Sequence, residues 1–584
     1  MKKLICILLV LALTAGTLCS CADNGSDNSG NNVDSGAESS EIPDEPGAQI
    51  TEVEVKASLT AESSTVLDIT SSELFNVLAE ERTPSNTILH LDDDLFVVAD
   101  DGLYVPFEAA MAMCEGSTIP VLYVSSKKSA TALGERLNEN GMTDCIVMSD
   151  DAELVKITRE LAPKISGAVD KRDYKLDDDI TYMIQLRDEA NSNNAKIILL
   201  NSNASSEQVL YLQRRLMTVW IEAKDESVAS HCNAFVSGAN GVVSADCDNM
   251  FGAIDLFEKD TLFREVSIVG HRGQPVTNVD NTLSGAKAAI AAGADAIECD
   301  IQLTADMEFV IMHDNNIAYY TSGKGITEEL RTEQIQYFIL KGTKDEHIPK
   351  LQEFFEEFRN EDIIHTIEIK TSNPDAVYWL RDLIAQCGVS HQVNLISFNI
   401  DQLKLARQVM PEISCGYLGS INGVYDDISQ ALNTYNFSYH PVNSRMSPGN
   451  AYELNNRGIS VNTWTYSDKN TLYQDLLSGY ASLTTDGSCW ASEFVAGIKP
   501  KKSYKLTLGE PTEFEATAVT KTGEKKVVCE PVAVGGDDIT FTYADGGYVA
   551  SAAGSVTVML KYGERLENGT TVYHYSQAVN VTVK

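Results

Sequence analysis

The feature that most constrains the fold is a strand-then-helix rhythm that runs from about residue 265 to residue 498. Short apolar runs rich in β-branched residues recur there, and amphipathic stretches separate them. This alternation is typical of parallel strands joined by helices. About 235 residues of it suit one (β/α)8 TIM barrel, whose usual length is about 250 residues. The expected strands are 267–271, 296–301, 309–313, 366–370, 394–398, 460–465 and 482–486.

The same alternation precedes this region, over residues 51–262, with expected strands at 119–124, 145–148, 196–200 and 219–221. Several residues recur at a constant spacing of 248 positions: Ser149, Arg159 and Pro163 return as Ser397, Arg407 and Pro411. We interpret this as an internal duplication of a barrel. We therefore predict an α/β chain in which a degenerate, incomplete barrel-like domain (51–262) precedes an intact TIM barrel (263–499).

After Pro500 the pattern changes to short segments that alternate with period two between Gly, Asp and Asn turns. This pattern predicts a small all-β sandwich over residues 500–584. The segment resembles bacterial immunoglobulin-like domains, which implies a spacer or an adhesive module with a cell-envelope ligand.

The N-terminus indicates export. Lys2 and Lys3 precede an apolar run from Leu4 to Leu18 that is too short to span a bilayer but suits a signal peptide. Its end, Leu-Cys-Ser-Cys, resembles a lipoprotein lipobox, which implies a signal peptide over 1–20 and lipidation of Cys21. Cys19 is the competing site, and an ordinary secretory signal is the alternative. Residues 21–50, rich in Asn, Asp, Ser and Gly, read as a disordered linker.

Composition narrows the function classes. The 584 residues carry a formal net charge of −39, so nucleic-acid binding is disfavoured because the chain's own field repels a polyanion. The 12 cysteines show no CxxC pair, which argues against a zinc site or a disulfide framework. With the lipobox, we expect a bacterial, extracytoplasmic protein in the cell envelope that contacts the membrane only through a lipid anchor.

Candidate metal ligands lie on two expected strands. Glu298 and Asp300 are two positions apart, so they point to one face of their strand. Glu368 has the same relation to Lys370 on a later strand. Three carboxylates that converge without His or Cys favour a hard divalent cation, Mg2+ or Ca2+. A surface cluster of acids is the alternative, and the isoleucines around these residues argue against it.

Two histidines and two cations complete the constellation. His271 and His313 would flank the metal as a general acid and a general base, because imidazole titrates near neutral pH. Arg272 and Lys370 would bind a phosphate. These groups together suit a phosphodiester-cleaving site at the carboxyl ends of the barrel strands.

Residues 266–490 resemble the glycerophosphodiester phosphodiesterase family, a barrel relative of phosphatidylinositol-specific phospholipase C. The matching pieces are HRG at 271–273, NT at 281–282, ExD at 298–300, HD at 313–314, EIK at 368–370, Trp464-Thr465 and Thr485-Asp486. The resemblance implies catalytic roles for His271 and His313, metal ligation by Glu298, Asp300 and Glu368, phosphate contacts from Arg272 and Lys370, and Trp464 beside the glycerol. Asp280 stands where the family motif has Glu.

The expected function is therefore metal-dependent hydrolysis of glycerophosphodiesters, small-molecule substrates, to glycerol 3-phosphate and an alcohol. One alternative is the same chemistry on lysophospholipids or glycerol-phosphate wall polymers. Another is a non-catalytic surface-binding protein. Residues 51–262 lack the HRG and ExD pieces, and only His90 echoes the HD piece. This first region is thus expected to be a packing partner or a binding module.

Overall fold

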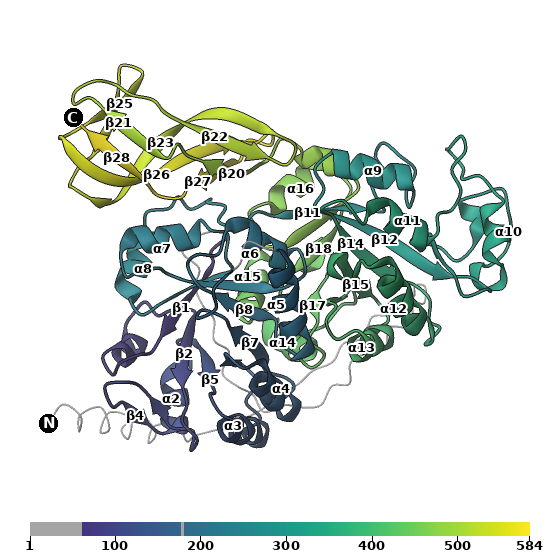
Figure 1. Cartoon of the computed structure of the whole chain (residues 1–584), viewed down its shortest axis with the longest axis horizontal. Helices are drawn as coiled ribbons and strands as arrows, with labels where there is room; N and C mark the ends of the chain where they lie inside the picture. The colour runs from purple at the N-terminus through teal and green to yellow at the C-terminus, as the bar shows by residue number, and fades with distance from the viewer. Residues whose placement is uncertain (1–60, 177–179) are drawn as a thin grey trace, which may run out of the picture.

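The computed structural model describes residues 61–176 and 180–584. They form two α/β barrels side by side and an all-β domain that lies along one side of the pair (Figure 1). Within these ranges, no helix is both long enough and apolar enough to cross a membrane. The predicted signal peptide, the lipidation site at Cys21 and the predicted linker lie outside the described residues, so these three predictions stay open.

The first barrel is closed, so the prediction of an incomplete barrel is wrong. Eight parallel strands form a ring in the order β1-β10-β9-β8-β7-β6-β5-β2. They are β1 (Ser64–Asp68), β2 (Asn86–His90), β5 (Ile119–Tyr123), β6 (Ile146–Ser149), β7 (Ser166–Asp170), β8 (Ile197–Leu200), β9 (Thr218–Glu222) and β10 (Gly241–Ser244). The helices are α2 (Phe107–Cys114), α3 (Lys127–Asn140), α4 (Ala152–Leu161), α5 (Ile180–Ser192), α6 (Ser206–Gln213), α7 (Val228–Phe235) and α8 (Cys247–Ile254). A small hairpin, β3 (Val97–Val98) with β4 (Tyr104–Val105), follows β2.

The second barrel confirms the predicted TIM barrel. Its parallel strands run β17-β16-β15-β14-β12-β11-β19-β18, and bridges Tyr439–Val461 and Val442–Trp464 join the two ends. They are β11 (Ser267–His271), β12 (Ala296–Leu303), β14 (Ile364–Ile369), β15 (Val393–Ser397), β16 (Cys415–Tyr417), β17 (Ser438–Tyr439), β18 (Asn462–Tyr466) and β19 (Ser482–Thr485). The helices are α9 (Leu283–Ala291), α10 (Thr332–Gln336), α11 (Leu351–Phe358), α12 (Ala376–Cys387), α13 (Ile400–Val409), α14 (Tyr425–Asn433), α15 (Pro448–Asn456) and α16 (Lys469–Asp475).

One strand that the sequence pattern predicted as part of the barrel lies outside it. β13 (Phe309–Ile311) pairs antiparallel with β12 and lies off the barrel path. His313 therefore follows a hairpin, whose return strand brings it back beside Asp300, since the Met312 N–H donates to the Asp300 carbonyl oxygen. The strands that the sequence pattern missed, β16 and β17, have three and two residues, too few to show a period.

The two barrel interiors are filled differently. Inside the first barrel, eleven buried apolar side chains, Trp220 among them, form one cluster. Inside the second, the corresponding cluster holds only Val269, Ala296 and Ile364. Trp220 on β9 corresponds to Asn462 on β18, at the 242-residue spacing that also relates the turns before these strands. The first barrel is thus a packed core, and the second leaves space inside.

The barrels pack through the ends at which their strands begin. Thr218, the first residue of β9, donates to the Gly458 carbonyl oxygen (2.9 Å), and Ser414 before β16 donates to the Arg215 carbonyl oxygen (2.6 Å). The contacts repeat in pairs: Arg159 donates to the Asn433 carbonyl oxygen, and its counterpart Arg407 donates to the Asn191 carbonyl oxygen. The carboxyl-end rims of the two barrels consequently open away from each other.

The C-terminal domain contains β20 (Val495–Lys499), β21 (Ser503–Leu506), β22 (Phe514–Thr520), β23 (Glu524–Gly536), β24 (Phe541–Ala544), β25 (Gly547–Ala550), β26 (Gly554–Arg565), β27 (Thr571–Tyr575) and β28 (Val579–Val583). The long β23 pairs with β22 through its first half and with β26 through its second half. This confirms an all-β domain, and its immunoglobulin-like character stays a prediction. Lys521 of this domain contacts Asp295 of the second barrel (2.6 Å).

The seam between the barrels yields a stability prediction. Gly458 has φ +79°, and a Cβ there would lie 2.5 Å from Cγ1 of Ile197 in the first barrel. We expect Gly458→Ala to lower the free energy of unfolding by about 2 kcal/mol or more, from strain and overpacking together. Urea denaturation followed by circular dichroism measures the change. Gly449→Ala is the matched control, because its Cβ meets nothing within 4 Å; equal effects of the two substitutions would contradict the close contact.

Candidate active site

The site begins at a tight turn after β11. Arg272 and Gly273 both have positive φ, +53° and +93°, so the chain reverses directly after His271. A Cβ on Gly273 would lie 2.6 Å from the Gly285 carbonyl carbon, so only glycine fits there. The turn aims the Arg272 N–H at Glu298, whose Oε2 accepts it at 3.0 Å. The HRG piece thus joins the end of β11 to the acidic strand β12.

Three carboxylates meet at the carboxyl end of this barrel. Glu298, Asp300 and Glu368 are buried, and one oxygen from each lies within 4.8 Å of the others. Strand register produces the meeting, because Asp300 on β12 pairs directly with Glu368 on β14. The structure therefore brings together all three predicted metal ligands.

Burial and mutual repulsion control the charges of these acids. Burial, with the charges of Asp300 and Glu368, raises the pKa of Glu298 well above its ordinary value. Burial and Asp300 also raise the pKa of Glu368 to about 7. Burial would raise the pKa of Asp300 too, but Lys370 and Arg272 lower it below its ordinary value. The trio fits a divalent cation, which would relieve the repulsion.

Arg272, Lys370 and Asn281 hold Asp300 in place. Arg272 Nε lies 3.3 Å from Asp300 Oδ2, and Lys370 Nζ lies 3.3 Å from Oδ1 of the same residue. Lys370 also contacts Glu368 at 2.7 Å. Asn281 donates from Nδ2 to Asp300 at 2.9 Å and accepts the Asp300 N–H at 3.3 Å. Sequence reasoning gave Asn281 no role, although its place in the NT piece was visible.

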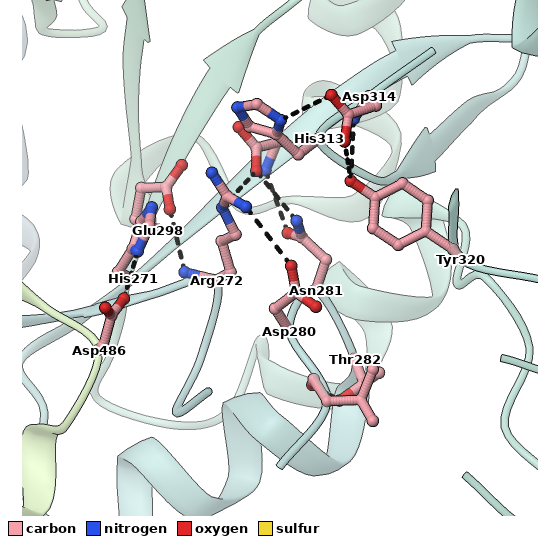
Figure 2. Close-up of polar contacts among 12 residues, drawn as sticks. His271, Arg272, Asp280, Asn281, Thr282, Glu298, His313, Asp314, Tyr320 and Asp486 are labelled. Atoms are coloured by element: carbon pink, nitrogen blue, oxygen red, sulfur yellow. Dashed lines mark hydrogen bonds and ion pairs between the residues drawn. The ribbon is translucent and has the colours of Figure 1, made fainter. Parts of the chain in front are cut away.

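The two histidines lie on either side of Arg272, each beside an aspartate (Figure 2). His271 Nδ1 lies 2.6 Å from Asp486 Oδ1. Burial opposes ionisation of Asp486, but hydrogen bonds from His271 and Ser467 lower its pKa below the ordinary value. The charged carboxylate of Asp486 therefore holds the His271 ring in one orientation. Sequence reasoning quoted Asp486 as a motif residue without giving it this role.

His313 also lies beside an aspartate, and its side chain is partly exposed. Its Nδ1 is 3.3 Å from Asp314, and Tyr320 donates to the other oxygen of Asp314 at 2.6 Å. Burial lowers the pKa of His313, although Asp300 opposes this shift. Asp280, which stands where the family motif has Glu, lies 3.5 Å from Arg272 Nη1, so the shorter acid still reaches the turn.

One pocket joins these groups. Its lining includes His271, Arg272, Glu298, His313, Glu368, Lys370 and Trp464. Trp464 donates from its ring nitrogen to the His440 carbonyl oxygen (2.7 Å), and its ring packs edge-on against exposed Phe398, with centroids 5.6 Å apart.

By contrast, His90 of the first barrel pairs with Asp68 at 2.8 Å, and Asp68 also binds Arg172. Of the described residues, only the trio in the second barrel could group three ligands around a metal ion.

Comparison with known proteins identifies the family that the second barrel matches. Residues 271–488 match the glycerophosphoryl diester phosphodiesterase family model. The second barrel belongs to this family. A glycerophosphodiester phosphodiesterase from Caldanaerobacter subterraneus is 29% identical over 227 residues, which cover 38% of this chain and 93% of the relative. A putative glycerophosphodiester phosphodiesterase of Bacillus subtilis is 24% identical over 232 residues, again 38% of this chain and 93% of the relative.

Solved structures also resemble part of the chain. A glycerophosphodiester phosphodiesterase from Agrobacterium tumefaciens is 20% identical, with 39% of this chain and 99% of that one covered and a TM-score of 0.36. A phosphodiesterase from Oleispira antarctica, solved with the product sn-glycerol-3-phosphate, is 21% identical, with 38% and 93% covered and a TM-score of 0.35. The family model matches residues 271–488, which are less than half of the 584-residue chain.

The raised pKa of Glu368 predicts how stability depends on pH in the family barrel. In the unfolded chain this acid ionises near pH 4.5, and in the folded, metal-free protein near 7. The contribution of Glu368 to the free energy of unfolding is therefore fully present below the unfolded pKa. It is lost as pH rises toward 7, and the loss is about 3 kcal/mol. With excess EDTA, Glu368→Gln should lose less unfolding free energy between pH 5 and pH 8 than the wild type. Urea titrations measure it, with exposed Glu333→Gln as the control; parallel curves for all three proteins would contradict the shift.

Proposed function

We propose that the second barrel is a metal-dependent phosphodiesterase that hydrolyses glycerophosphodiesters to glycerol 3-phosphate and an alcohol. The observation that carries the proposal is the meeting of three buried carboxylates with two histidines and two cations in one pocket. A phosphate diester is an anion whose two alcohol oxygens each need proton transfer during cleavage. A site with positive charge and two imidazoles supplies both needs. The family match and the names of the relatives support this chemistry.

Glu298, Asp300 and Glu368 are the residues that would hold the divalent cation. All-oxygen ligation suits Mg2+ or Ca2+, and either ion would supply positive charge to the phosphate oxygens. Without a cation, burial favours the protonated forms of Glu298 and Glu368, because it raises the pKa of each. Arg272 and Lys370 already contact Asp300, so they lie where they can orient a phosphate beside the carboxylates.

The histidines divide the proton transfers. Asp486 holds Nδ1 of His271, which leaves Nε2 to take a proton from a hydroxyl of the substrate glycerol. That oxygen attacks phosphorus to form a cyclic phosphate, while His313 donates a proton to the departing alcohol oxygen. In the second half, His313 takes a proton from a water whose oxygen attacks phosphorus, and His271 returns a proton to the ring oxygen whose P–O bond breaks. The net change consumes one water, breaks the P–O bond to the departing alcohol and forms one P–O bond to the oxygen of that water.

The proposed setting is the bacterial cell envelope, with Cys21 as the lipid anchor and glycerophosphodiesters as the small-molecule substrates. The lipobox-like sequence supports it. We also propose a cell-envelope ligand for the C-terminal domain, on its resemblance to immunoglobulin-like modules. Lysophospholipids and glycerol-phosphate wall polymers remain the alternative substrates for the same chemistry.

An assay with chelator tests the proposed function. The purified protein should release glycerol 3-phosphate from glycerophosphocholine, and EDTA should abolish the release until Mg2+ or Ca2+ is restored. A coupled glycerol 3-phosphate assay measures the rate. Cleavage that continues unchanged in EDTA would show that the carboxylates do not act through a metal, and absence of cleavage with every headgroup would refute the activity.

Substitution of either histidine tests the mechanism. His271→Ala and His313→Ala should each lower kcat by about 10²–10⁴-fold, because each removes one proton transfer. Calorimetric titration with Ca2+ should show little change in either variant, since neither histidine is a proposed ligand. His347→Ala is the matched control, because that histidine is exposed and contacts only the Phe338 carbonyl oxygen among its described partners. Full turnover by either variant would remove that histidine from the mechanism.

A further inference from the structure

A single buried aspartate joins the starts of three strands in the second barrel. Asp295 directly precedes β12; its N–H donates to the Ile268 carbonyl oxygen (2.8 Å), and its Oδ2 accepts the Ile268 N–H (2.7 Å). Its carbonyl oxygen accepts the Ile364 N–H (3.2 Å). Asp295 is thus bonded to β11 on one side and to β14 on the other.

Two of these strands carry the three carboxylates near their other ends. Glu298 and Asp300 lie on β12, and Glu368 lies on β14. Glu298 is three residues after Asp295, so about 10 Å of strand lies between them. The spacing of the three carboxylates therefore depends on how β12 is held between its neighbours, and Asp295 takes part in holding it there.

Both neighbouring domains supply a cation to Asp295. Arg214, on the turn between α6 and β9 of the first barrel, donates from Nη2 to Asp295 Oδ1. Lys521, on the turn between β22 and β23 of the C-terminal domain, lies 2.6 Å from Oδ2. Among the described residues these two are its ion-pair partners, so the charge of Asp295 is balanced from outside its own barrel.

This charge network is closed and largely buried. The side chains of Lys521 and Asp295 are 3% and 5% exposed, and Glu265 of the second barrel also contacts Lys521. Burial opposes ionisation of Asp295, but Lys521 and Arg214 keep its pKa below the ordinary value. Two acids thus face two cations. Removal of either cation would leave a buried carboxylate without its full compensation.

The turn that carries Lys521 packs closely on the second barrel. Gly293, two residues before Asp295, has φ +87°, and a Cβ there would lie 2.7 Å from the Lys521 carbonyl oxygen. Thr522 donates from Oγ1 to the Ser492 carbonyl oxygen (3.0 Å). The packing of this turn therefore fixes where the ammonium group meets Asp295.

We propose that Asp295 is a positioning residue for the metal site, and that Arg214 and Lys521, one from each neighbouring domain, hold it in place. The first barrel and the C-terminal domain then contribute to metal binding without touching the metal. Without either cation, hydration or protonation of Asp295 would weaken its bonds to Ile268, and the spacing of the acids on β12 against Glu368 on β14 would change. This inference rests on the proposed function, because it takes the three carboxylates as the metal ligands.

The two candidate ions distinguish a shift of the ligands from a general loss of stability. Mg2+ requires a nearly ideal octahedral set of ligands at short distances, whereas Ca2+ accepts a flexible set. A small displacement of β12 should therefore weaken Mg2+ binding more than Ca2+ binding. A variant that is only less stable, with an unchanged folded form, would bind both ions as the wild type does.

Calorimetric titration of the full-length protein with Mg2+ and with Ca2+ tests the proposal. Lys521→Met removes the ammonium group, and it should weaken Mg2+ binding by about tenfold or more, as loss of a group that supports metal ligands commonly does. Ca2+ binding should weaken less. Arg214→Met should have the same effect, and Lys521→Arg, which keeps the charge, should bind Mg2+ nearly as the wild type does.

Lys561→Met is the matched control. Lys561 on β26 also joins the C-terminal domain to the rest of the chain, through Glu258 (2.9 Å), and its side chain is 14% exposed. Its ion-pair partners among the described residues, Glu258 and Glu530, lie outside the second barrel. This variant should therefore keep the wild-type affinity for both ions.

Two results would overturn the proposal. Unchanged Mg2+ affinity in Lys521→Met and Arg214→Met would show that the network supports only stability. Equal weakening by Lys561→Met would assign the effect to domain docking in general. Circular dichroism establishes that each variant is folded, and Arg214→Met decides the matter if Lys521→Met does not fold.

Turnover of glycerophosphocholine on the same samples separates this proposal from the proposed function. A wild type that binds Mg2+ without cleavage would refute the activity, and the comparison of affinities would still decide the positioning role. Cleavage by the wild type with unchanged affinities in the variants would overturn the positioning role and leave the activity standing. A wild type that binds neither ion would refute the metal dependence and this inference together.

Discussion

Repulsion among three buried carboxylates is the constraint on which the rest of the second barrel depends. Glu298, Asp300 and Glu368 meet because β12 and β14 pair in one register, and burial makes their joint ionisation costly. Arg272, Lys370 and Asn281 each contact this trio, and they come from two separate turns and a strand. The HRG turn and the NT piece therefore each place a polar or positively charged group against the negative charge of this trio. A cation in the trio would complete the balance.

The two barrels share one architecture but differ in the side chains that fill their interiors and line their rims. Where the second barrel has Asn462, the first has Trp220, fully buried within a packed interior. At the first rim, Arg172 lies among Asp68, Asp170 and Glu222, so a guanidinium already neutralises acids there. Among the described residues of the first barrel, with its filled interior and neutralised rim, no three side chains are grouped so that they could hold a metal ion. The first barrel has instead kept its opposite face, which packs against the second.

The sequence predicted the second barrel and its acids well because each signal was local. Glu298 and Asp300 share a strand face by spacing alone, and the apolar residues around them indicated burial. The closure of the first barrel was missed because β1 (STVLD), β2 (NTILH) and β7 (SGAVD) each contain only two or three consecutive apolar residues. The roles of Asp486 and Asn281 were missed because they depend on contacts across 215 and 19 residues. The contact between the two barrels at Thr218 and Gly458 could not be predicted at all, because no pattern in the sequence says which faces of the two barrels meet.

The paired contacts of Arg159 and Arg407 resemble those of a symmetric dimer whose two halves have become one polypeptide. Once both halves share a chain, each meets the other at an effective concentration of about millimolar, however dilute the protein is. Association then no longer demands that both copies stay alike. One copy can then differ at its carboxyl-end rim while it keeps its docking face. In this molecule only the second barrel groups three candidate metal ligands among the described residues.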